Sequence, residues 1–273
     1  FDSDGFTVDD DVIVNTSSEK YVAWCWKANG TGSSNTDGTI NTTATSVNTT
    51  AKFSIVTYTG NGSAGATIGH GLGVVPTFII LKSVSMTGGA AEAWRVYHGQ
   101  NTAAPETDYL ALNTTAATAD ALNAWNDVAP TSSVFSLGDG GGVNTDSETN
   151  VAYVWRDVQG FSKFGSYTGN GNAEGPFVYT GFRPAWLLIK KTSADNDWLI
   201  YDNKREGYNV DNDYFLADTT AAEADDTDID IVSNGFKIRG DAHYVNTSAG
   251  TYVYAAFAEA PFVNSNGVPC NAR

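Results

Sequence analysis

The chain contains the same short phrase twice. FSIVTYTGNG begins at Phe53, and FSKFGSYTGNGN begins at Phe161. On its own, Thr-Gly-Asn-Gly would indicate only a tight hairpin, because glycine and asparagine tolerate positive φ. Two occurrences constrain the chain more than one hairpin would, if they mark a repeat of the whole fold. Such a repeat predicts that other segments match in the same order.

Three further pairs of segments match in the order that a repeat requires. Each pair shares residue types that define strands and turns: glycine and proline before an apolar run, tryptophan and tyrosine three positions apart, and a shared Asp-Tyr followed by Thr-Thr-Ala-Ala. The pairs are GVVPTFIILKS with GFRPAWLLIKK, AWRVYHG with DWLIYDN, and DYLALNTTAA with DYFLADTTAA. Together they predict two copies of one module.

The N-terminus contains part of a third copy. An Asn-Thr pair is followed, at the same number of positions, by an aromatic residue three times, in Asn15 to Trp26, Asn144 to Trp155 and Asn246 to Phe257. Residues 1–27 thus align on 134–156 and on 235–258. We expect residues 1–28 to be the remnant of a preceding β-domain, with further polypeptide before Phe1.

Length and local composition predict how the rest of the chain is divided. At 273 residues it is long enough for two domains of ordinary size plus a fragment. Residues 29–52 are rich in Thr, Ser, Asn and Gly, which predicts a linker, or a segment ordered only by packing against neighbouring chains of a fibre. We therefore expect a linker at 29–52, modules at 53–160 and 161–262, and a C-terminal tail at 263–273.

The modules are expected to be all-β. Short β-branched or aromatic runs such as Phe78 to Leu81 and Trp186 to Ile189 are bounded by Gly, Asn, Asp or Thr, and no window shows a sustained helical pattern. Six or seven such strands in a module of this size are typical of an antiparallel β-sandwich, here in tandem and jelly-roll-like.

Charge and cysteine content exclude several classes of protein. The net charge of −16 and the pI near 4.3 argue against nucleic-acid binding, because phosphates require clustered Lys and Arg. Cys25 and Cys270 do not support a disulfide framework. No apolar run reaches membrane-spanning length, so we expect no membrane insertion.

The sequence predicts no enzyme. His70, His98 and His243 are isolated from any Ser, Cys or Asp at a catalytic spacing, and the glycine-rich segments are not followed by the Gly-Lys of a phosphate loop. We expect His70, between glycines, to have a turn or hydrogen-bonding role. Carboxylates are too numerous for two of them to be singled out as a glycosidase pair.

Two groups of residues are candidates for binding. Asp226, Asp228 and Asp230 would share one face of an extended segment and would offer oxygen ligands to Ca²⁺, although a solvated acidic face is the simpler interpretation. Aromatic residues at equivalent places in the two modules, beside an aspartate, are typical of sugar binding, although packing explains them too. We expect one member of each aromatic pair to lie in the core and the other to be exposed; the candidate ligand-binding residues are Trp94, Tyr97, Trp198, Tyr201 and Asp197.

Longer strings carry a resemblance to a known family. They are YVAWCWKANG, SNTDGTI, FSIVTYTGNGSAG, IGHGLGVVP, GFSKFGSYTGNGNAEGPFVYTGFRPAWLLIKK, YDNKREGYNVD, SNGFKIRG and GTYVYAAFAEAPF. Together they resemble the C-terminal repeat module of tail-fibre-like and other structural proteins of tailed bacteriophages, many of them marine. The resemblance covers nearly the whole chain and transfers no catalytic residue.

The resemblance implies a homotrimeric virion appendage, assembled in the host cytoplasm with other virion proteins and displayed on the virion surface. We expect a tail-fibre or spike component that binds host-surface polysaccharide through its β-sandwich modules, without a cofactor other than the candidate calcium ion. The alternatives are an architectural fibre, filament or capsid-decoration protein without a host ligand, a polysaccharide depolymerase, and a bacterial surface adhesin.

Overall fold

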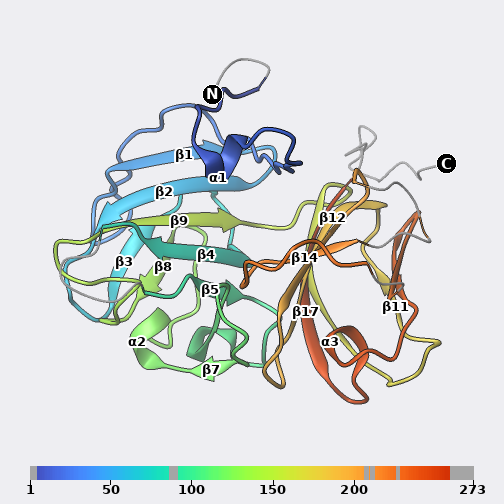
Figure 1. The fold of residues 1–273 in the computed structure, drawn as a ribbon. Coiled ribbons are helices and arrows are strands. Elements are labelled where there is room, and N and C mark those ends of the chain that lie inside the picture. Colours follow the sequence, from blue (N-terminus) through green and yellow to red (C-terminus); the bar gives the residue numbers. More distant parts are fainter. Residues whose placement is uncertain (1–4, 86–91, 206–208, 210–212, 226–227, 259–273) are drawn as a thin grey trace.

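The computed structural model describes residues 5–85, 92–205, 209, 213–225 and 228–258. Its 17 strands form antiparallel ladders, and the helices in the described part are single turns. The prediction of an all-β antiparallel protein is confirmed. Two bodies of sheet lie side by side, with the strands of one turned relative to those of the other (Figure 1).

Module 1 is a two-layered sandwich. Its large sheet has the order β1-β2-β9-β4-β5-β6-β7, and its second layer is the pair β3-β8. Apolar residues at alternate positions of both layers, such as Val56 and Ile68, form a core between them. The strands are β1 (Ala44–Asn48), β2 (Phe53–Thr59), β3 (Ala66–Gly69), β4 (Phe78–Ser83), β5 (Arg95–His98), β6 (Asp108–Ala111), β7 (Ala119–Asp120), β8 (Val134–Leu137) and β9 (Thr149–Trp155), with η1 (Pro105–Thr107) and α2 (Leu122–Trp125) between them.

Module 2 has the same plan. Its large sheet has the order β10-β17-β12-β13-β14, and its second layer is β11-β16-β15. A separate core lies between these layers and includes Leu187 and Phe236. The strands are β10 (Ser162–Thr168), β11 (Phe177–Tyr179), β12 (Pro184–Lys191), β13 (Trp198–Asp202), β14 (Tyr214–Leu216), β15 (Ile229–Val232), β16 (Gly235–Ile238) and β17 (Thr251–Ala258), with α3 (His243–Asn246) before β17.

The repeat in the sequence is a repeat in topology. The strands β2-β9-β4-β5-β6 occupy the places of β10-β17-β12-β13-β14. The last strand of each module is the central one, with β9 between β2 and β4 and β17 between β10 and β12. The register differs in one respect, because Phe53 faces Trp155 whereas Ser162, and not Phe161, faces Phe257. The two Phe-Ser pairs at the start of the phrase are therefore one residue out of structural register.

The segment predicted to be a linker, 29–52, belongs to module 1, so that prediction is corrected. Its residues Ala44–Asn48 form β1, which pairs along its whole length with β2. Ile40 is part of the core and forms a bridge with Ile68. The many threonines are β-branched and bond to one another, as the buried hydroxyls of Thr42 and Thr45 do at 2.9 Å, so a polar composition is compatible with an edge strand.

The two large sheets pack face to face, which gives the molecule four layers. Their outward faces form a third apolar cluster, to which Phe78 and Trp155 contribute from module 1 and Phe164 and Phe257 from module 2. The rings of Phe78 and Phe164 stack with centroids 5.0 Å apart.

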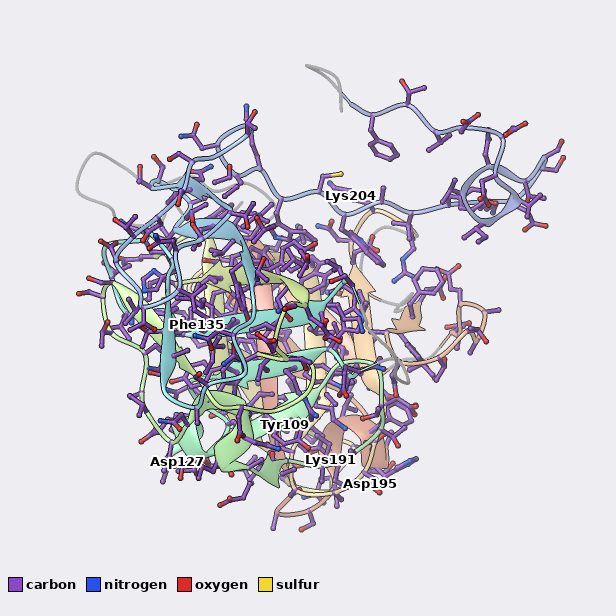
Figure 2. All side chains as sticks on the ribbon, turned by 90° about the vertical axis from the view of Figure 1, so that its left-hand side faces the viewer. Tyr109, Asp127, Phe135, Lys191, Asp195 and Lys204 are labelled. Carbon is purple, nitrogen blue, oxygen red and sulfur yellow. The ribbon has the colours of Figure 1, made fainter. Side chains whose placement is uncertain are left out.

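The N-terminal segment lies along the mouth of this interface. It contains α1 (Val12–Asn15) and then runs extended through residues 20–28. In Figure 2 it crosses the top of the molecule near Lys204. In the described residues, no helix has the length and apolar character needed to cross a membrane.

Candidate functional site

Hydrogen bonds between the modules fix the position of one large sheet against the other. The indole of Trp198 donates to the carbonyl oxygen of Ala111 at 2.9 Å. The buried Nζ of Lys190 donates to the carbonyl of Thr115 at 2.7 Å and also to that of Asn196. Burial lowers the pKa of Lys190 to about 8, against the opposing attraction of Asp218 and two other aspartates. The modules are therefore joined by buried polar contacts as well as by apolar packing.

His98, the last residue of β5, joins the modules at a second place. Its Nε2 donates to the carbonyl of Tyr254 at 3.1 Å, and its Nδ1 accepts from the backbone N–H of Gln100 at 3.2 Å. Burial lowers the pKa of His98 to about 4, so the ring is neutral at pH 7 and takes one donor and one acceptor role. His70 makes the same pair of contacts within module 1: its Nε2 bonds the carbonyl of Thr131, and its Nδ1 accepts from the backbone N–H of Leu72 in its own turn. Both histidines thus shape turns.

A polar groove opens where His98 turns the chain. It has a volume of about 380 Å³ and lies between the loop after β5 and the adjacent ends of β10, β12 and β17. Amide and hydroxyl side chains from both modules line it together with two tyrosines. The lining residues are Gln100, Asn101, Thr102, Ser166, Tyr167, Thr168, Thr192, Thr251 and Tyr252.

Local bonds order the polar groove. Thr118 donates to Asn101 Oδ1 at 2.8 Å, and the hydroxyls of Thr192 and Thr251 are also 2.8 Å apart. Ser166 and Thr168 are exposed. Neutral amides and hydroxyls match sugar hydroxyls, and none of the described residues that line this groove carries a carboxylate.

An aromatic groove flanks the extended segment 20–28. One side has a volume of about 490 Å³ and is lined by Ile55, Ile80, Trp94, Leu112 and Tyr153 with Trp24 and Trp26; the other side, of about 450 Å³, is lined by Trp155, Trp186 and Phe257 among others. Among the described residues, the first side has no charged or amide lining residue. Sugar hydroxyls would find few partners there, so this surface suits an apolar partner.

The structure separates the residues predicted to bind a ligand. Tyr97 is buried in the core of module 1, as expected for one member of its pair, whereas in the second pair Tyr201 is buried in the core of module 2 and Trp198 between the modules. The expectation of an exposed aromatic is therefore wrong for the pair Trp198 and Tyr201. Trp94 is half-buried in the aromatic groove and Asp197 is half-exposed. The physical reason is that Trp198 lies on the outward face of its sheet, which the other module covers.

The predicted calcium ligands do not form a site in the described residues. Asp226 lies outside them. Asp228 is buried, with Oδ1 so near Gly240 that a Cβ there would be 2.0 Å away, and Asp230 lies 3.3 Å from Nε of Arg239. No group of three metal-ligating side chains occurs in the part of the chain that the structure describes.

The residues of the polar groove were not predicted from the sequence. They come from four separate segments, and single Ser, Thr and Asn residues carry no recognisable spacing. Only the repeat offers a signal, because Ser166 precedes the repeated Tyr-Thr-Gly-Asn-Gly phrase and Thr168 belongs to it.

Fold and grooves define an all-β tandem-repeat protein with a polar groove between its modules. A family model described as a domain of unknown function, DUF7483, matches residues 1–261, and the chain belongs to this family. No curated protein matches the chain. No solved structure matches it either.

Proposed function

We propose that the protein is a structural component of a bacteriophage tail fibre or spike that attaches to host-surface polysaccharide through the polar groove. The groove itself carries the proposal, since it offers neutral hydroxyl and amide groups from two modules that share a buried interface. The acidic net charge keeps such a protein off anionic cell surfaces except where specific contacts form.

The proposed assembly is a homotrimer, built in the host cytoplasm with other virion proteins and displayed on the virion surface. Three linked copies would raise the apparent affinity of a weakly binding groove by avidity. This part of the proposal rests on the resemblance of the long strings to phage appendage modules.

A binding comparison tests the proposed function. The protein is applied to immobilised bacterial capsular polysaccharides and lipopolysaccharides, beside a Thr168→Arg variant in the groove. Thr59 is the equivalent exposed residue of module 1 and lies outside the groove lining, so Thr59→Arg is the matched control. We expect binding by the protein and by T59R and a loss of at least about tenfold for T168R, since a long charged side chain fills the groove. Equal binding by both variants would exclude the polar groove as the attachment site.

The same samples separate the alternatives. New reducing ends would identify a depolymerase, and binding to none of the polysaccharides would favour an architectural protein. The aromatic groove is the observation that favours an architectural role, because an apolar surface of this kind is typical of contacts between protein elements. Detection of the protein on bacterial cells rather than on virions would identify a bacterial adhesin.

A further inference from the structure

The N-terminal segment reproduces the helical turn that precedes the last strand of a module. We call this turn the corner; it comprises residues 12–21 in the N-terminal segment and 243–252 in module 2. A one-turn helix occurs at Val12–Asn15 and at His243–Asn246. Three residues after the end of each helix, Ser18 and Ala249 have positive φ, as does Ser147 at the corresponding place in module 1. Non-glycine residues adopt this conformation uncommonly, so its recurrence at three aligned positions marks one turn in three copies.

The same hydrogen bonds close the corner in the first and third copies. Tyr21 Oη accepts from the backbone N–H of Thr16 at 2.8 Å, and Tyr252 Oη accepts from that of Thr247 at 2.8 Å. Each tyrosine hydroxyl also donates to the carbonyl of the first helical residue, as does the threonine hydroxyl. The N-terminal corner is therefore folded as in a complete module.

One asparagine in each corner distinguishes the complete copies from the N-terminal one. The side-chain amides of Asn144 and Asn246 are fully buried, and each bonds the Thr-Gly-Asn-Gly loop of its own module through Asn61 or Asn170. Both also donate to a carbonyl six residues earlier. Asn15 makes this last contact, with Asp9 at 2.8 Å, but is exposed.

The residues after the corner alternate as a central strand does. Trp26 faces the interface, with its ring 6.5 Å from that of Trp155 and 5.3 Å from that of Phe257, which are its equivalents in the two modules. The opposite face is exposed. Cys25 is exposed, whereas its equivalents Val154 and Ala256 are fully buried in the cores of modules 1 and 2.

The corner is exposed in the same way. Val14 is 45% exposed, whereas its equivalents Val143 and Val245 are 1% and 0% exposed. Tyr21 is 52% exposed, whereas Tyr252 is fully buried. One face of this segment is packed as in a complete module, and the face that would meet a module's own core is open.

We propose that residues 20–28 are the central strand of a third module, and that the aromatic groove on both sides of them is the docking surface for the strands of that module. In modules 1 and 2 every strand that pairs with the central strand precedes the corner in sequence. The occupant we propose is therefore polypeptide joined ahead of residue 1, with an apolar-faced sheet and a Thr-Gly-Asn-Gly loop that closes on Asn15. The inference does not rest on the proposed function.

Cys25 provides a probe of this docking surface. Its alkylation by iodoacetamide is followed by peptide mapping in the chain of residues 1–273 and in the protein with every residue of its natural polypeptide. We expect the Cys25 thiol of residues 1–273 to react as a free thiol and that of the whole polypeptide to react at least about a hundredfold more slowly, because modification would require local unfolding. Backbone amide hydrogen exchange over residues 21–27 should slow in parallel.

Equal reactivity in both proteins would overturn the proposal. So would protection in the chain of residues 1–273 that increases with protein concentration, because the occupant would then be a second copy. An Asn15→Ala variant of the whole polypeptide should regain Cys25 reactivity, because the loop contact is lost. An Asn29→Ala variant, outside the corner, should not.

Discussion

The indole Nε1 of Trp198 donates a hydrogen bond to the carbonyl oxygen of Ala111, 2.9 Å away and in the other module. Trp94, the equivalent residue of module 1, is half-buried in the aromatic groove. Two residues at the same place in the repeat therefore have different surroundings, because the face-to-face packing of the two large sheets covers only one of them.

Replacing Trp198 should destabilise both modules together. We expect Trp198→Ala to lower the free energy of unfolding by about 3 to 5 kcal/mol, since it leaves a cavity at the interface and removes the hydrogen bond to Ala111. Trp94→Ala, the matched control, should cost clearly less. Urea unfolding followed by fluorescence and circular dichroism measures this difference, and equal losses for the two variants would contradict the described packing.

The buried corner asparagine should be a second determinant of stability. Asn246→Ala removes the amide that bonds Asn170, Asn172 and Gly240, and we expect a loss of about 3 kcal/mol. Asn15→Ala in the chain of residues 1–273 should cost less than about 1 kcal/mol, because Asn15 is exposed. A loss at Asn15 as large as that at Asn246 would show that the N-terminal corner is closed in solution.

His98 should make the protein less stable in acid. Its pKa is about 4 when folded and 6.5 when unfolded, so the unfolded state binds more protons between these values and stability falls as the pH falls through this window. From pH 7 to pH 5 the contribution is about 2 kcal/mol. A His98→Gln variant should lose less stability over this range by that amount in urea titrations, and an unchanged pH dependence would refute the assignment.

Removal of divalent ions should leave the assembly unchanged. Asp230 is paired with Arg239, and Asp228 is buried against Gly240. We expect light scattering to give the same mass, that of the proposed trimer, with and without EDTA. Dissociation by EDTA would restore the calcium hypothesis and direct attention to Asp226, Asp228 and Asp230.

The modules were predictable because their signals are local and occur twice. Alternating β-branched and aromatic residues define the strands, and the glycines of Thr-Gly-Asn-Gly fit where a side chain would not; a Cβ at Gly60 would lie 2.2 Å from the carbonyl oxygen of Thr145. The edge strand β1 was missed because Thr, Ser and Asn also compose linkers, and only pairing with β2 distinguishes the two.

The polar groove was not predictable from these signals. Gln100 and Ser166 lie in different modules and become neighbours only when the large sheets pack against each other. The same packing buried Trp198, which the sequence had suggested for ligand binding. Residue type shows which side chains can bind a sugar, whereas the relative placement of the sheets determines which of them are accessible.

Nuclear magnetic resonance is the most direct test of the proposed attachment site. Oligosaccharides prepared from a polysaccharide that the protein binds are titrated into the isotope-labelled protein, and backbone amide shifts are followed. We predict saturable shifts centred on residues 100–102, 166–168, 192 and 251–252. Shifts centred elsewhere, or none at saturating oligosaccharide, would contradict attachment through the polar groove.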